Sequence, residues 1–227
     1  MRITISKENY LKAIAEAESE GEAVKAVTLT RWLRVSAPAV TMAIKRLKRD
    51  SLIRVGKDGQ ISLAPAGRKI AGRILNRHHL IERMLAEIFG LEWYKVHDEA
   101  EQLEHAVSAE FERKLIEKLG TTTPCPHGNL VELDSPVARR SRGLKPLEEA
   151  RTGTCVAIES VLERDRRLLE PLDARGIRPG VRVEVIAQGK VTVLQVGHEQ
   201  VRVTRAAAGK VWVREELSQL ANPPFLA

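Results

Sequence analysis

The stretch TLTRWLRVSAPAVTMAIKRLKR, residues 28–49, decides the fold of the N-terminal part of this chain. Thr28 is expected to cap one short helix, and Ser36 is expected to cap a second helix, with Pro38 tolerated in its first turn. The inward face of this second helix comprises Val40, Ala43, Ile44 and Leu47, which leaves the neighbouring basic residues exposed. Two helices joined by a tight turn, the second of them basic, are typical of a helix-turn-helix.

The flanking residues extend this pattern on both sides. Apolar residues recur at helical spacing over about 7–20, and two short apolar runs within 52–63 enclose the turn Gly56-Lys57-Asp58-Gly59. Helix, short helix, turn, helix and hairpin together predict a winged helix-turn-helix, whose second helix would enter the major groove of DNA. A merely solvated basic face is the alternative explanation of the charge.

Composition excludes several classes of protein. The chain has 227 residues, of which 43% are hydrophobic, and it is neither disordered nor fibrous. We find no apolar run of about 18 residues and no secretory signal, and Cys125 and Cys155 are too few for a disulfide scaffold. The expected location is the reducing cytoplasm, with no membrane partner.

The formal net charge of +7 averages over unlike segments. Residues 1–74 carry +8, residues 75–130 carry −4 and residues 131–227 carry +3. A basic segment that meets polyanions is therefore followed by an acidic one that attracts cations.

The rest of the chain predicts two further domains. Long helices are expected over Pro65–Phe89 and Lys95–Leu119, an extended loop and linker over 120–152, and a small antiparallel barrel after Gly153 with one helical insert near 164–173. The fold class is therefore mainly α with β. The predicted boundaries are 1–74 for DNA binding, 75–138 for a helical domain, 139–152 for a linker and 153–227 for the barrel.

Candidate metal ligands gather in the acidic segment. At about 100° per residue, one helix face carries His97, Glu101, Glu104 and His105, and the preceding helix carries His78 and Glu82 one turn apart. Facing helices that offer imidazoles and carboxylates build metal sites in bundles, although solvated acidic faces give the same spacing. A thiol and another imidazole follow in Cys125-Pro-His127-Gly, whereas we exclude His79 and His198 and expect Cys155 to be buried.

Two other functions are weighed against a metal sensor. Glu101-Gln-Leu-Glu104-His105 approaches the His-x-x-Glu-His pattern of zinc proteases, but Glu stands where the first His should be. A metallohydrolase would also leave the basic helix-turn-helix unexplained, and we expect no enzyme and no small organic substrate. The second alternative is a winged-helix regulator that does not depend on metal.

The order of these motifs resembles the diphtheria-toxin-repressor family of iron- or manganese-dependent transcriptional regulators. The resemblance covers essentially the whole chain. It rests on Tyr10-Leu-Lys-Ala-Ile14, Val35-Ser-Ala-Pro-Ala-Val40, Arg77-His78 through Glu82-Arg83, Val96-His97 through Glu104-His105, and Cys125-Pro-His-Gly-Asn129. It implies a winged helix-turn-helix, a helical dimerisation and metal-binding domain, and an SH3-like (FeoA-type) domain.

Carried over by position, the resemblance implies two sets of metal ligands. One set comprises His78, Glu82, His97, Cys125, His127 and Asp165, with Glu163 competing for the place of Asp165. The other comprises Glu101, Glu104, His105 and Asn9, where iron-type members carry Met and manganese-type members carry Asp in place of Asn9. Lys12 stands where some manganese regulators have a further acid, which argues against a close binuclear cluster.

Glu101 favours manganese. Iron-type members usually have Cys at this position, and a hard carboxylate suits Mn²⁺. Mn²⁺ is therefore the first choice, Fe²⁺ stays a candidate because of Asn9 and Cys125, and Zn²⁺ and Co²⁺ are further candidates in vitro.

The expected function is a homodimeric repressor that binds a palindromic DNA operator when metal is bound. Its two recognition helices would enter major grooves about 34–36 Å apart. The residues expected at base edges are Ser36, Pro38, Ala39, Thr41 and Met42, and those expected at phosphates are Lys45, Arg46, Lys48 and Lys57.

Overall fold

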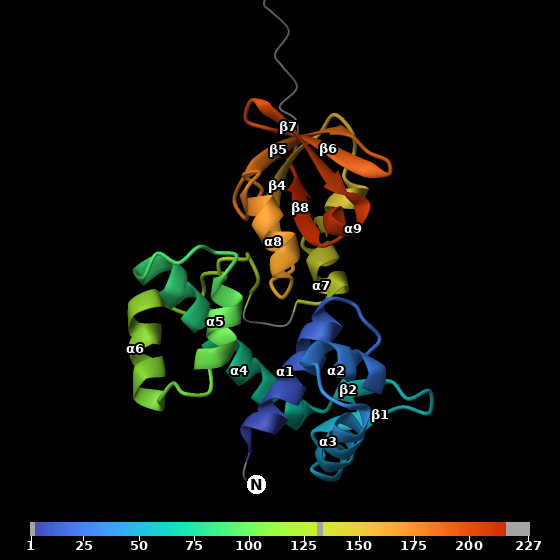
Figure 1. Ribbon diagram of the computed structural model, residues 1–227, viewed down its shortest axis with the longest axis vertical. Coiled ribbons are helices and arrows are strands. Elements are labelled where there is room, and N and C mark those ends of the chain that lie inside the picture. Colours follow the sequence, from blue (N-terminus) through green and yellow to red (C-terminus); the bar gives the residue numbers. More distant parts are fainter. Residues whose placement is uncertain (1–2, 131–133, 217–227) are drawn as a thin grey trace, which may run out of the picture. The chain divides into compact units, whose positions relative to one another are not determined.

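The N-terminal residues form a winged helix-turn-helix, which confirms the prediction from residues 28–49 (Figure 1). The computed structural model describes residues 3–130 and 134–216. The elements of this first domain are α1 (Ile5–Ser19), α2 (Ala26–Leu33), α3 (Ala37–Arg49), β1 (Ile53–Val55) and β2 (Ile61–Leu63). The two strands pair antiparallel and form the wing.

The turn between α2 and α3 follows the predicted chemistry at its second helix and departs from it at the first. The Ser36 side chain accepts a hydrogen bond from the backbone N–H of Ala39, as expected of an N-cap. Helix α2 begins before Thr28, whose hydroxyl instead accepts from the backbone N–H of Lys25. Thr28 is therefore the third residue of α2 and not its N-cap. The sequence alone did not distinguish these two positions.

The core of this domain lies among the apolar faces of its three helices. Val40 and Leu47 of α3 are buried, and Ala43 and Ile44 pack against the same core from partly buried positions. Gly67 in the next helix lets that helix pass close to the wing, since a Cβ there would lie 2.0 Å from the Leu52 carbonyl oxygen. Helix α3 is thus held firmly by one face while the other stays exposed.

The helices that follow are α4 (Pro65–Arg83), a short π-helix η1 (Met84–Ile88), α5 (Val96–Leu103) and α6 (Ala109–Leu119). The continuous helix predicted over Lys95–Leu119 is wrong, because α5 and α6 are separate. Ser108 caps α6 by accepting from the backbone N–H of Phe111, which starts a new helix inside an uninterrupted apolar repeat. Leu80, Ile81, Val96, Ala100 and Leu115 form the core between these helices.

The C-terminal part is a six-stranded sheet with strand order β3-β8-β4-β5-β6-β7, in which every neighbouring pair is antiparallel. Its strands are β3 (Leu144–Pro146), β4 (Cys155–Val161), β5 (Arg182–Ala187), β6 (Val191–Val196), β7 (Glu199–Thr204) and β8 (Val211–Glu215). The helices of this part are α7 (Pro136–Ser141), η2 (Leu147–Glu149), α8 (Arg166–Asp173) and α9 (Arg205–Ala208). The alternating apolar pattern after Gly153 predicted β4 to β8, but not β3.

Two expectations for this region need correction. Residues 139–152 are no bare linker, since β3 pairs with β8 and η2 follows it directly. Their Pro and Gly content hid a strand of only three residues. Cys155, expected to be buried, is exposed at the first position of β4.

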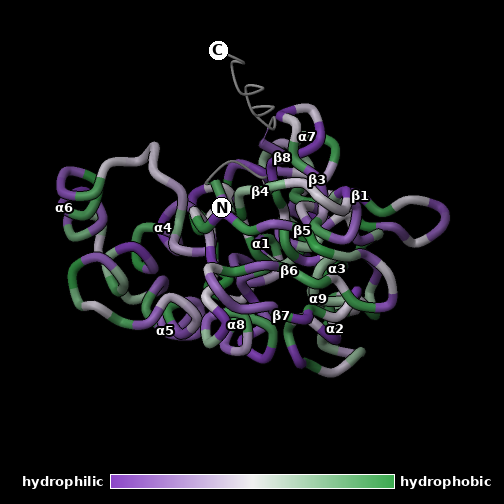
Figure 2. The backbone as a smooth tube through the Cα atoms, turned by 90° about the horizontal axis from the view of Figure 1, so that it is seen from above, coloured by the Kyte–Doolittle hydropathy of each residue, from purple (hydrophilic) through white to green (hydrophobic). Residues whose placement is uncertain are grey.

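The chain divides into two compact units between residues 138 and 139, and each is described by itself. Hydrophobic and hydrophilic residues mix along the helices and strands (Figure 2), as expected of elements with one buried face. Among the described residues, no helix combines the length and the apolar character needed to cross a membrane.

Candidate metal centre

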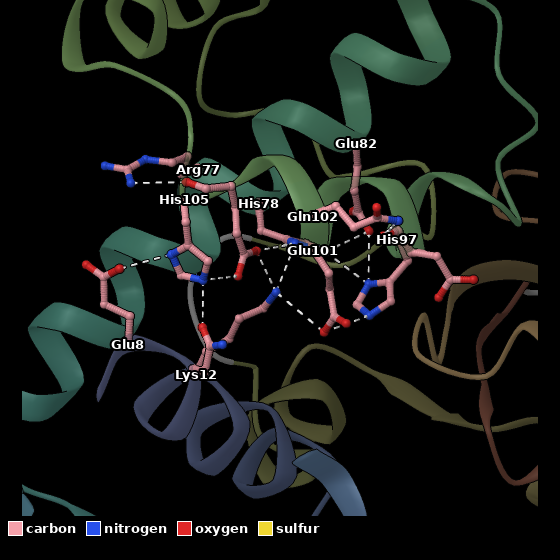
Figure 3. A network of polar contacts seen from close by, with 12 residues as sticks. Glu8, Lys12, Arg77, His78, Glu82, His97, Glu101, Gln102 and His105 are labelled. Atoms are coloured by element: carbon pink, nitrogen blue, oxygen red, sulfur yellow. Dashed lines mark hydrogen bonds and ion pairs between the residues drawn. The ribbon is translucent and has the colours of Figure 1, made fainter. Parts of the chain in front are cut away.

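Helices α4 and α5 bring three of the predicted ligands together in the interior. His78 and Glu82 lie one turn apart on α4, His97 lies near the start of α5, and all three side chains are buried. His78 Nε2 lies 2.9 Å from His97 Nδ1 and 3.1 Å from Glu82 Oε1, and His97 Nδ1 lies 3.3 Å from the same oxygen. Figure 3 shows these three side chains pointing toward one another.

The loop after α6 adds a fourth member. Hydrogen bonds from Gly128 N–H to the Cys125 carbonyl and from Cys125 N–H to the Asn129 carbonyl fold this loop into a turn. His127 Nδ1 lies 3.4 Å from Glu82 Oε1, and Cys125 Sγ lies 3.8 Å from His127 Nδ1. We call His78, Glu82, His97 and His127 the histidine cluster; Cys125 lies beside it, and all five side chains are buried.

His79 is a candidate that the sequence reasoning excluded. One ligand atom each from His79, Glu82 and Cys125 lies within 4.8 Å of the others. The two neighbouring histidines therefore approach Glu82 from different sides, because adjacent helical residues differ by about 100° in direction. The sequence alone did not show that Cys125 lies close to His79 and Glu82.

Glu82 gives this cluster its negative charge. Burial raises the pKa of its carboxyl group, but the neighbouring His127 and His78 outweigh burial and hold the pKa well below its usual range. Glu82 Oε2 is buried and has no hydrogen-bond partner among the described residues. An ionised buried carboxylate with one uncompensated oxygen, surrounded by imidazoles and a thiol, fits a divalent transition-metal ion.

A second polar group lies where α1 meets α5. Lys12 Nζ donates to Glu104 Oε2 at 2.7 Å, and it lies 3.8 Å from Glu16 Oε1 and 3.9 Å from Glu101 Oε1. We call Lys12, Glu16, Glu101 and Glu104 the lysine cluster. Burial lowers the pKa of Lys12, but the three carboxylates outweigh burial and raise it above its usual range. Two members of the second predicted ligand set thus face a lysine ammonium.

The other two members of that set contact each other nearby. His105 Nε2 lies 2.6 Å from Asn9 Oδ1, and His105 Nδ1 lies 3.1 Å from Glu8 Oε2. The contact of Glu8 was not predicted, because nothing in the spacing within α1 relates it to position 105.

His78 joins the two clusters (Figure 3). Its Nδ1 lies 2.6 Å from Glu104 Oε2 and 2.9 Å from Lys12 Nζ, while its Nε2 faces Glu82 and His97. Arg77, the residue before His78, also contacts this region. Its guanidinium donates to the Glu104 backbone carbonyl and to the Glu112 carboxylate. The Arg77 contacts were not predicted.

Asp165, predicted as a ligand from the C-terminal part, has a local role in its own unit. Its side chain accepts from the backbone N–H groups of Arg167 and Leu168 and caps α8. Glu163, the competing assignment, lies two residues before this cap.

The predicted DNA-contacting residues all lie on exposed positions of α3, its capping turn and the wing. They are Ser36, Pro38, Ala39, Thr41, Met42, Lys45, Arg46, Lys48 and Lys57. The face of α3 opposite Val40 and Leu47 is therefore available to a partner.

Comparison with known proteins agrees with this organisation. Residues 2–61 match the family model described as iron dependent repressor, N-terminal DNA binding domain. Residues 64–131 match the metal binding and dimerisation domain of the iron dependent repressor, and residues 145–215 match the FeoA domain. The domain matches thus follow the order of the winged domain, the helices that carry the two clusters, and the sheet.

Whole-chain relatives agree as well. The chain is 34% identical over 200 residues to the diphtheria toxin repressor of Corynebacterium efficiens, covering 84% of this chain and 87% of the relative. It is 34% identical over 222 residues to the iron-dependent repressor IdeR of Mycobacterium tuberculosis, covering 92% and 96%.

Among solved structures, a manganese-dependent transcriptional repressor in complex with manganese superposes with a TM-score of 0.82 at 27% identity, covering 92% of this chain and all of that one. Members of this family are transcriptional repressors and not enzymes, so the hydrolase alternative is not favoured. The chain belongs to the iron-dependent repressor family of metal-dependent transcriptional repressors.

Proposed function

We propose that this protein is a homodimeric repressor that binds a palindromic operator when Mn²⁺ or Fe²⁺ occupies the histidine cluster. The observation that carries the proposal is the buried, ionised Glu82 with its uncompensated oxygen among His78, His97 and His127. Cys125, His79 and a carboxylate of the C-terminal domain, Asp165 or Glu163, are further candidate ligands. A bound divalent cation would place positive charge beside the Glu82 oxygen that has no hydrogen-bond partner among the described residues.

The hydrogen bonds of His78 suggest how the site reaches the DNA-binding domain. When His78 carries its proton at Nδ1, it donates to Glu104 and leaves the Nε2 lone pair directed at Glu82 and His97. Glu104 in turn accepts from Lys12 on α1, which packs against α2 and α3. The orientation of the His78 ring is therefore connected, through Glu104 and Lys12, to α1, which packs against the recognition helix α3.

Exposed apolar residues support a dimer. Ile88, Phe89, Leu103 and Phe111 are large, at least 38% exposed, and lie within the domain whose model is named for dimerisation. Such residues on neighbouring elements are typical of a protein–protein interface. A symmetric pair of recognition helices would then match the two halves of a palindrome.

Mn²⁺ is our first choice of metal and Fe²⁺ the second. Glu101 in place of Cys and the Cys125-Pro-His127-Gly turn both follow the manganese-type pattern of the family. Carboxylate donors suit Mn²⁺, while the imidazoles and the thiol of Cys125 are softer donors that favour Fe²⁺ or Zn²⁺.

The operator is found by selection from a random-sequence duplex library with Mn²⁺ present. We expect enrichment of a palindromic sequence, and tight binding of that duplex with Mn²⁺ or Fe²⁺ under anaerobic conditions but not with chelator. His78→Ala is expected to abolish the metal dependence, whereas Glu110→Gln, an exposed acid on α6, serves as the matched control. Equal affinity with metal and with chelator would favour the metal-independent alternative.

A further inference from the structure

The lysine cluster already contains a cation. Lys12 is only 3% exposed, and its ammonium lies within 3.9 Å of carboxylate oxygens from Glu16, Glu101 and Glu104. A divalent ion shared by Glu101 and Glu104 would have to lie near this ammonium, which already contacts Glu104 Oε2 and lies 3.9 Å from Glu101 Oε1. Repulsion between like charges in a buried environment opposes such an arrangement.

The remaining two residues of the second set do not offset this repulsion. His105 Nδ1 lies 3.1 Å from Glu8 Oε2, and its Nε2 lies 2.6 Å from Asn9 Oδ1 and 3.4 Å from Glu104 Oε1, so both ring nitrogens already have polar partners. Asn9 also contributes a neutral oxygen where an acid would add negative charge. The residues present therefore do not fit a second divalent ion.

We propose that the ammonium of Lys12 takes the place of a second metal ion, so that each protomer binds a single divalent ion, at the histidine cluster. This inference rests on the proposed function of that cluster. Lys12 then joins α1 to α5 through Glu104 whether or not metal is present, and it positions His78 through the same carboxylate. Of the two clusters in this protein, only the histidine cluster therefore responds to metal.

The test counts metal in the full-length protein. Wild type, Lys12→Arg and Lys12→Met are equilibrated with excess Mn²⁺, freed of unbound metal by gel filtration in a low Mn²⁺ concentration, and measured by elemental analysis. We expect one Mn²⁺ per protomer for wild type and for the charge-preserving Lys12→Arg. Lys12→Met, which removes the charge and keeps the length, should bind two.

Electron paramagnetic resonance gives a second readout on the same samples. Wild type should show isolated Mn²⁺, and Lys12→Met should show a signal broadened by coupling between neighbouring ions. Thermal unfolding gives a third, because Mn²⁺ should restore more stability to Lys12→Met than it adds to wild type. A role of Lys12 in packing alone would not produce this extra rescue.

The possible failures are distinguishable. Two Mn²⁺ per wild-type protomer would overturn the inference and leave the proposed function intact. No bound Mn²⁺ or Fe²⁺ in wild type would contradict the proposed function itself. If Lys12→Met does not fold in chelator, the wild-type count and its resonance spectrum still decide, and failure of Mn²⁺ to rescue that variant would count against the inference.

Discussion

The histidine cluster and the lysine cluster both include residues of α5 or its C-cap, yet a different neighbouring segment completes each one. A loop brings His127 and Cys125 to Glu82, which adds donor atoms and no fixed positive charge. Helix α1 brings Lys12 to Glu101 and Glu104, which adds an ammonium. The segment that meets α5, and not the spacing within the helix, thus decides whether a group of acidic residues is suited to an added cation.

The contacts of the histidine cluster therefore change when a metal binds, whereas those of the lysine cluster are permanent. The histidine cluster leaves one Glu82 oxygen without a hydrogen-bond partner among the described residues, whereas the chain itself supplies the ammonium of the lysine cluster. Because His78 takes part in both, its hydrogen bonds connect the two.

Removing the Lys12 charge should have the largest effect on stability. Lys12→Met leaves three carboxylates near one another without their cation, and losing one partner of a buried ion pair costs about 3–5 kcal/mol. We expect a decrease of this size in the free energy of unfolding, measured by urea denaturation in chelator. Lys114→Met, which breaks an exposed pair with Glu117, should cost less than about 1 kcal/mol. Equal decreases would show that the lysine cluster is no more than a surface network.

Neutralising Glu82 should weaken metal binding at the histidine cluster. Glu82→Gln removes the buried charge that a metal would compensate, so we expect Mn²⁺ affinity to fall on the order of 100-fold. Stability in chelator should fall as well, because the lowered pKa of Glu82 means that the folded state favours its ionised form. Calorimetric titration and urea denaturation measure the two effects, with Glu110→Gln as the control. Wild-type Mn²⁺ affinity in Glu82→Gln would rule out Glu82 as a ligand.

Substitutions on α3 should leave both clusters unchanged and weaken DNA binding. Lys45→Ala removes an exposed charge from the recognition helix, and we expect affinity to fall to a similar extent for all duplex sequences. If Lys45 binds one phosphate, the slope of log affinity against log salt concentration should decrease by about 1. Lys118→Ala on α6 is the matched control. A weakening restricted to the selected operator would instead assign Lys45 to base recognition.

The smallest effect is expected at the edge of the histidine cluster. Cys125→Ser replaces a soft thiol by a hard hydroxyl, so Zn²⁺ and Fe²⁺ affinities should fall on the order of tenfold, with little change for Mn²⁺. Competition titrations with a chromophoric chelator measure all three metals. An equal decrease for every metal would mean that Cys125 acts by packing and not as a selective donor.

Local signals predicted the winged domain well. The Ser36 cap, the apolar face of α3 and the alternating strands of the sheet are all written in short stretches of sequence. The break between α5 and α6 was missed because the apolar repeat continues through it, and a single Ser at position 108 was not recognised as a cap.

The candidate site was predictable only within each helix. Spacing identified His78 with Glu82 and His97 with Glu101, since those relations are local. The roles of Lys12, His79 and Glu8 depend on which distant segment faces them: α5, the loop at Cys125 and His105, respectively. Contacts between residues so far apart in the chain carry no local pattern.

The most direct test of the account is the affinity of the selected duplex for wild-type protein at fixed salt, measured by fluorescence anisotropy with Mn²⁺ and with chelator. Coupling between two sites typically changes affinity by about 5- to 150-fold. We predict that Mn²⁺ strengthens binding by at least the lower figure in wild type, that Glu82→Gln loses this gain, and that Lys12→Arg keeps it. Equal affinity of wild type in Mn²⁺ and in chelator would contradict the account.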